Sequence, residues 1–224
     1  VVVGGCGRFG PGVVWRHGRS GWSSAGRSRY WPLYAGNCWV PAAGRLFVFG
    51  HEGSMPRSGF CSLDPAGNAW QTYPSESMPR RRTRMDNYMC WDSKRGRVLL
   101  QRFAIEGDPG GTLAGTWAFD PESTNWTDLK PETQPVSRGH GAMAYSARED
   151  ALLLYGGDGR GGETWVYNCA PNAWRQLDPD ANPPPRTRHA LYYDPSADLF
   201  VVYGGSGTGG YLGDTWVFRL PASK

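Results

Sequence analysis

Short apolar runs alternate with turn residues along the whole chain, and one such run returns at a nearly constant interval. The run Leu153–Gly157 reads LLYGG, and it is echoed as VVYGG at Val201–Gly205 and as VVVGG at Val1–Gly5. Degenerate copies stand at Gly50 and Arg102, so the spacings between first glycine positions are 46, 52, 54 and 48 residues. The sequence is therefore a repeat array with about fifty residues in each copy.

The tryptophans report the same period independently. The last tryptophan of each unit recurs at intervals of 48, 56 and 48 residues, at Trp22, Trp70, Trp126 and Trp174. Trp117 and Trp165 stand nine residues before the last two of these, and Trp216 continues that series. Because these side chains recur in step with the repeat, we expect most of them to pack between copies rather than to bind sugars.

Each unit holds four short segments rich in β-branched and aromatic residues, separated by turn residues. In the fourth unit we predict strands at 140–146, 151–156, 163–168 and 174–177. Asp-Pro turns, such as the one that begins at Asp194, fit tight reversals between antiparallel strands. A four-stranded unit cannot cover its own apolar faces, so the copies must pack face to face, and radial stacking achieves this with only short exposed edges.

These phrases resemble kelch repeats, including those of the central domain of galactose oxidase. The family pattern is matched by the diglycine at Gly156, by Trp165 and Trp174, and by the phrase GDTWVF that begins at Gly213. The resemblance implies an all-β, kelch-type β-propeller of four-stranded antiparallel blades, with about five blades represented and with the first strand of each blade lining the central channel. We expect one domain, 1–224, with these approximate blades: 1–25, 36–73, 86–129, 139–177 and 188–219.

The strand count departs from that of a complete ring. The predicted segments supply 18 strands where five full blades need 20, and the two ends do not complete one blade together. We therefore expect these residues to be part of a longer propeller of six or seven blades. The alternative is a small five-bladed ring with two incomplete blades at its ends.

Composition narrows the class of protein. The chain has 224 residues, of which 39% are apolar and 13% aromatic, so it can bury a substantial core. No run of eighteen apolar residues and no signal peptide are visible, so we expect no membrane association. The five cysteines are odd in number and lack metal-binding spacing, which predicts reduced, buried thiols and favours a cytoplasmic location.

Candidate catalytic chemistry is not readable. The glycine-rich loop that starts at Gly156 leads into another strand and lacks the Gly-Lys-Ser/Thr ending of a phosphate loop. The four histidines fall in different units, no Tyr-His dipeptide supports the copper site of galactose oxidase, and no nucleophile motif occurs. We therefore predict a protein that is not an enzyme and that has no cofactor and no metal ion.

Basic residues recur just before the strands that should line the channel. Loops from successive blades meet at one mouth of a propeller, so these side chains would concentrate positive potential there. The sequence predicts a binding site for a protein partner, with an acidic segment favoured because Arg pairs with carboxylates in a bidentate manner. The predicted residues are Arg80, Arg81, Arg82, Arg84, Arg138, His140, Arg160, Arg186, Arg188 and His189.

Alternatives to this interpretation remain open. Recurrence at one register position also fits arginines that only bridge adjacent blades, most directly for Arg138 and Arg186. A carbohydrate-binding or carbohydrate-active propeller would use acids such as Asp108 and Asp158 with an exposed aromatic such as Trp31. A third alternative is a structural subunit of a larger complex. Nucleic acid is not expected, since no aromatic residues interleave with the basic ones.

Overall fold

A computed structural model describes residues 2–3, 13–27, 36–51, 58–66, 69–73, 85–104, 115–158, 162–179 and 181–220. Within these ranges the regular elements are β-strands and a single 3-10 turn at Pro41–Ala43. The predicted all-β class is confirmed. No helix of the described part is long and apolar enough to cross a membrane.

Four blades follow one another along the chain, and we number them 2 to 5 after their repeat units. Blade 2 consists of β4 (Gly36–Val40), β5 (Arg45–His51), β6 (Ser58–Asp64) and β7 (Ala69–Thr72). Blade 3 consists of β8 (Met85–Asp92), β9 (Arg97–Ala104), β10 (Gly115–Asp120) and β11 (Asn125–Asp128). Blade 4 consists of β12 (Ala142–Ser146), β13 (Ala151–Tyr155), β14 (Thr164–Asn168) and β15 (Ala173–Leu177). In all three the strands pair antiparallel in chain order, as predicted.

Blade 5 and the first unit each contain three paired strands among the described residues. Blade 5 consists of β16 (Ala190–Asp194), β17 (Leu199–Tyr203) and β20 (Thr215–Phe218). A small hairpin of β18 (Ser206–Gly207) and β19 (Gly210–Tyr211) is inserted between β17 and β20. The first unit forms a sheet of β1 (Val2–Val3), β2 (Val13–Gly18) and β3 (Gly21–Arg27).

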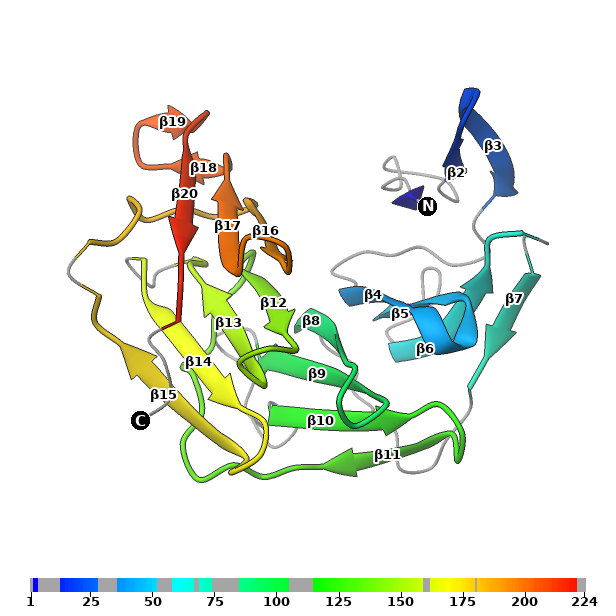
Figure 1. Ribbon diagram of the computed structural model, residues 1–224, viewed down its shortest axis with the longest axis horizontal. Helices are drawn as coiled ribbons and strands as arrows, with labels where there is room; N and C mark the ends of the chain where they lie inside the picture. Colours follow the sequence, from blue (N-terminus) through cyan, green and yellow to red (C-terminus); the bar gives the residue numbers. More distant parts are fainter. Residues whose placement is uncertain are drawn as a thin grey trace.

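The blades fan around a common inner edge. The first strands of successive blades contact one another, β4 with β8, β8 with β12 and β12 with β16, whereas β7, β11 and β15 lie on the outside (Figure 1). This radial arrangement of antiparallel sheets is a β-propeller, and the first strand of each blade is the innermost, as expected.

Apolar side chains fill the spaces between neighbouring blades. Leu99 and Phe103 of blade 3 form one core cluster with Leu152, Leu154 and Trp174 of blade 4. A further cluster joins blade 4 to blade 5 through residues such as Leu153, Val166 and Phe200. Blades 3 and 4 are thus covered on both faces by their neighbours, and burial of this kind supplies the main favourable free energy of folding.

The diglycine serves the contact between blades. Gly156 and Gly157 have φ angles of 67° and 110°, a region that side chains with a Cβ rarely adopt. A Cβ on Gly156 would lie 2.6 Å from the carbonyl oxygen of Arg186 in the next blade. Glycine is therefore required by the close approach of two backbones, which explains the motif structurally.

Candidate functional site

Asp86, His140 and Arg188 occupy the same position in three successive blades. In each blade the residue two places further along, Tyr88, Ala142 or Ala190, pairs with the equivalent residue of the second strand. Since the first strands are innermost, the three side chains follow one another along the inner rim of the fan, where their strands begin.

These three residues also contact one another. The His140 amide donates to Asp86 Oδ2 at 2.9 Å, and the Arg188 amide donates to the His140 carbonyl oxygen at 2.8 Å. The imidazole Nδ1 of His140 lies 2.7 Å from Asp158 Oδ2, and its Nε2 lies 3.4 Å from a guanidinium nitrogen of Arg188. The rim therefore carries an acid, an imidazole and a guanidinium in order around the axis.

Burial shapes the chemistry of Asp86. Desolvation raises the pKa of its carboxyl, while the hydrogen bond from the His140 amide and the charge of His140 lower it. The side chain thus acts mainly as a buried acceptor that fixes the backbone of the next blade.

Arg138 and Arg186 do not reach the surface. Both guanidinium groups are fully buried, and each pairs with an acid that precedes the third strand of its own blade. Arg138 Nη2 lies 2.7 Å from Glu163 Oε2, and Arg186 forms a bidentate pair with Asp214 at 2.7 and 2.8 Å. The two arginines also donate to the carbonyl oxygens of the first diglycine residues, Gly156 and Gly204.

The tryptophan of the third strand completes this arrangement. Trp165 Nε1 donates to Glu163 at 2.9 Å, and Trp216 Nε1 donates to Asp214 at 2.6 Å. Hydrogen bonds from Arg186 and then Trp216 hold the pKa of Asp214 well below its usual range. The hydrogen bonds of the two guanidinium groups connect segments of their own blade, whereas the alternative left open by the sequence had them bridging adjacent blades. Any role of theirs in binding a partner stays a prediction.

His189 is also buried, although the sequence placed it at the predicted recognition face. Its ring packs edge-on against Tyr155 with centroids 5.4 Å apart. Burial and then the charge of Arg186 lower its pKa to about 4, so the imidazole is neutral at physiological pH. As it stands, this side chain supplies no charge for a partner.

Several predicted residues lie outside the described ranges. They are Arg80, Arg81, Arg82, Arg84 and Arg160, and their part in a partner site stays a prediction. The same holds for Trp31 and Asp108, which the carbohydrate alternative invoked.

Among the predicted basic residues that the structure describes, Arg188 is the one that is exposed, while His140 is partly exposed. Arg188 forms no ion pair with any described carboxylate. It lines an open cavity of about 630 Å³ with these residues: Ala190, Tyr203, Gly204, Gly205, Ser206, Tyr211 and Leu212. Tyr203 is 55% exposed and Tyr211 is 97% exposed. The site therefore offers a guanidinium and two phenol rings.

The positions of the cysteines, histidines and acids bear on disulfides and on a metal site. Cys38, Cys61, Cys90 and Cys169 lie buried without disulfides, whereas Cys6 lies outside the described residues. In the part of the chain that the structure describes, no three His, Cys, Asp or Glu side chains converge as a metal site requires. The cytoplasmic location stays a prediction.

Two parts of the site escaped prediction from the sequence. Asp86 was overlooked because the basic residues were aligned by type rather than by strand register, which places Asp86 opposite His140. Glu163 and Asp214 were overlooked although each stands two residues before a third-strand tryptophan, a repeat signal visible in the sequence.

Comparisons with known proteins point to the architecture alone. No family model and no curated protein matches the sequence. Among solved structures, TolB from Acinetobacter baumannii is similar with a TM-score of 0.61 and 9% sequence identity. The match covers 93% of this chain and 46% of that chain, so it spans less than half of TolB. At this identity the likeness supports the β-propeller fold and carries no function.

Proposed function

We propose that the chain is a non-enzymatic interaction scaffold that binds an acidic segment of a partner protein at the rim of the propeller. The observation that carries this proposal is the open cavity at Arg188, which combines an accessible guanidinium with the rings of Tyr203 and Tyr211. Arginine and tyrosine are among the residue types that most often anchor protein interfaces.

Arg188 forms no ion pair with a described carboxylate. Asp158 is already engaged by His140, and Asp86 accepts the His140 amide, so neither forms an ion pair with Arg188. Among the described rim residues, Arg188 is therefore a cation with donors left for a carboxylate, which it can bind through two parallel hydrogen bonds.

We also propose that the propeller is of the kelch type. The support is the association of diglycine, arginine, acid and tryptophan in blades 4 and 5. Arg138 and Arg186 tie the carbonyl oxygen of the diglycine to the acid that receives the third-strand indole. This explains why these phrases recur together in the sequence.

A second candidate function is carbohydrate binding, favoured by Tyr211. Its ring is almost fully exposed on a hairpin beside the cavity, and an exposed ring beside polar groups suits stacking on a sugar. A glycan array with the wild-type chain and with Tyr211→Ala separates the candidates, since reproducible hits lost in the variant would favour the sugar.

Direct binding tests the leading proposal. A fluorescein-labelled, glutamate-rich peptide is titrated with the wild-type chain and with Arg188→Glu at low salt, and anisotropy is recorded. Charge reversal should weaken binding about tenfold or more, because an attraction becomes a repulsion. Binding should also weaken as salt rises.

The matched control is Arg175→Glu, since Arg175 is an exposed arginine on the outer strand β15 and the change in net charge is identical. We expect its affinity to stay within about twofold of wild type. Equal losses in both variants would show a general charge effect and would remove the proposed site.

A further inference from the structure

The outer edge of β20 lacks a fourth strand among the described residues. In blade 4 the third strand β14 pairs with β13 on one side and with β15 on the other. Its counterpart in blade 5, β20, pairs only with β17. An open edge of this kind presents unpaired backbone donors and acceptors to another strand.

The fourth strands of blades 3 and 4 each insert a tryptophan toward the preceding blade. Trp126 of β11 packs against Phe119 of its own blade and against Phe49 and Phe60 of blade 2, with centroids 4.8 to 5.5 Å apart. Trp174 of β15 packs on Tyr167 at 5.1 Å. Both indoles are almost completely buried.

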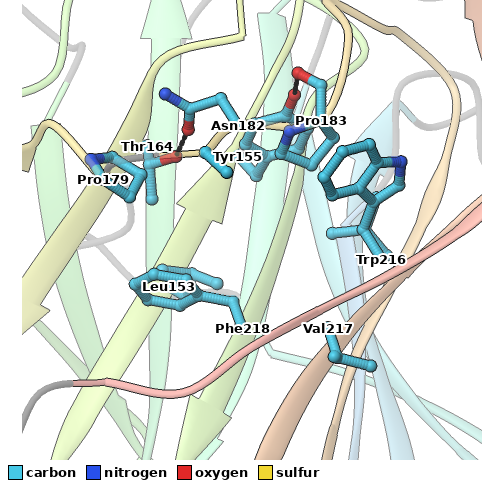
Figure 2. A pocket seen from close by; sticks show the side chains of 11 residues that line it. Leu153, Tyr155, Thr164, Pro179, Asn182, Pro183, Trp216, Val217 and Phe218 are labelled. Atoms are coloured by element: carbon cyan, nitrogen blue, oxygen red, sulfur yellow. Dashed lines mark hydrogen bonds between the residues drawn. The ribbon is translucent and has the colours of Figure 1, made fainter.

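The corresponding position of blade 5 is a pocket. Strand register identifies the equivalent positions of the blades. Thr164 corresponds to Thr116 and Phe60, and Tyr155 corresponds to Phe49. Phe218 corresponds to Tyr167 and Phe119. The side chains of Tyr155, Thr164 and Phe218 line this pocket together with Trp216 (Figure 2). Its cavity is small, about 30 Å³ by the measure that gives 630 Å³ at Arg188, and all the empty space there, the open mouth included, is about 360 Å³.

The residues around Trp174 and their equivalents around the pocket differ in solvent exposure. Trp165 and Tyr167, which share the core cluster of Trp174, are buried, as are Pro131 and Pro135 in the segment that follows blade 3. Their equivalents around the pocket are all partly exposed, namely Pro179, Pro183, Trp216 and Phe218. An aromatic side chain seated here would remove the same apolar surface from water that Trp174 removes in blade 4.

The pocket also reproduces the polar contact of the buried indole. Thr116 Oγ1 donates to Gln101 Oε1 at 2.6 Å and accepts from Trp174 Nε1 at 2.9 Å. Thr164 Oγ1 donates to Asn182 Oδ1 at 3.2 Å. A hydroxyl that donates once still has lone pairs to accept a hydrogen bond, so Thr164 can receive an indole N–H.

We propose that the edge of β20 and the pocket beside it bind an extended, tryptophan-bearing strand of a partner protein. The strand adds antiparallel to β20, its tryptophan enters between Phe218 and Tyr155, and the indole N–H donates to Thr164 Oγ1. Backbone pairing supplies sequence-independent affinity, and the pocket selects the aromatic residue. This surface uses none of the groups at the Arg188 cavity, so it stands or fails independently of the proposed function.

A peptide taken from the chain itself provides the probe. Residues 170–178 read APNAWRQLD and contain the fourth strand of blade 4. We expect the fluorescein-labelled peptide to bind the full chain at a ratio of one to one. Replacing its tryptophan by alanine should weaken binding about tenfold or more, because the pocket is then unfilled.

Two variants of the chain isolate the predicted hydrogen bond. Thr164→Val keeps the shape of the pocket but removes the acceptor, and it should weaken binding about fivefold or more. Asn182→Ala removes the same Thr164–Asn182 bond and leaves the hydroxyl in place, so its affinity should stay within about twofold of wild type. Equal effects in both variants would overturn the contact with Thr164.

Hydrogen exchange locates the added strand. Peptide binding should protect the amides of β20 and leave those of β14 unchanged, whereas protection of β14 would mean exchange with β15 and would overturn the proposal. Failure of the peptide to bind would show that a segment of the chain already covers the edge, which would equally overturn it. A concentration-dependent dimer in light scattering that excludes the peptide would assign the edge to a second copy instead.

Discussion

Arg186 donates two parallel hydrogen bonds of 2.7 and 2.8 Å to Asp214, and the same guanidinium donates to the carbonyl oxygen of Gly204 at 3.0 Å. One buried side chain thus joins the segment before the first strand of blade 5 to the end of its second strand and to the start of its third. This relationship is repeated by Arg138 and Glu163 in blade 4.

We predict that Arg186→Leu destabilises the chain. The substitution removes the guanidinium donor from the Gly204 carbonyl oxygen and from Asp214, which keeps the hydrogen bond from Trp216, and such losses cost more than the bond itself contributes. The melting temperature should fall by about 5 °C or more. Arg175→Leu, on the exposed outer strand, should change it by about 1 °C at most; similar values for both variants would contradict the bridging role.

Acid should weaken the Arg186–Asp214 pair. Because the pKa of Asp214 is lower in the folded chain than in the unfolded chain, its contribution is complete above the ordinary value of about 4 and is lost as pH falls toward the lowered value. In urea unfolding below about pH 4, Asp214→Asn should therefore lose stability less steeply than wild type. Parallel curves for the two proteins would refute this linkage.

His189 should add a separate pH dependence at milder acidity. Its pKa falls from 6.5 to about 4 on folding, so below pH 6.5 the unfolded chain binds the proton more readily and stability falls. Between pH 7 and pH 4.5 this costs about 2–3 kcal/mol. His189→Phe keeps a ring against Tyr155 and should flatten the curve over this window, and an unchanged slope would assign the titration elsewhere.

Gly156→Ala tests the close approach of blades 4 and 5. Gly44 is the matched control, since its φ of 59° resembles the 67° of Gly156 but a Cβ added there would meet no atom within 4 Å. Gly44→Ala should cost about 1 kcal/mol from backbone strain alone. Gly156→Ala should cost about 2 kcal/mol more, because its Cβ meets the Arg186 carbonyl oxygen. Equal free energies of unfolding would exclude the steric explanation.

The strands were predictable because each repeat reports its own register. For the fourth unit the expected segments 140–146, 151–156, 163–168 and 174–177 differ by at most two residues at either end from the observed strands. Even the degenerate third copy was aligned correctly. Arg102 pairs with Gly115, just as Gly156 bonds to Glu163, the residue of blade 4 that is equivalent to Gly115. Apolar periodicity and turn residues carry this information locally.

The candidate site was less predictable because the direction of a side chain depends on partners distant in sequence. Arg138 is buried by an acid 25 residues away, and Arg186 by one 28 residues away. Arg188, two residues beyond Arg186, is exposed although both are arginines before the same strand. Residue type alone does not separate a bridging arginine from an accessible one, whereas pairing each arginine with its acid through the repeat does.

The hairpin of β18 and β19 is attached to the blade mainly through the backbone bridge between Ser206 and Thr187. A Cβ added at its tip, on Gly209, would touch no neighbouring atom, and Tyr211 is almost fully exposed to solvent. Sequence and length can therefore change at this tip without disturbing the blade that supports it. Natural selection or engineering can therefore exchange the residues of this tip while the propeller architecture is inherited unchanged.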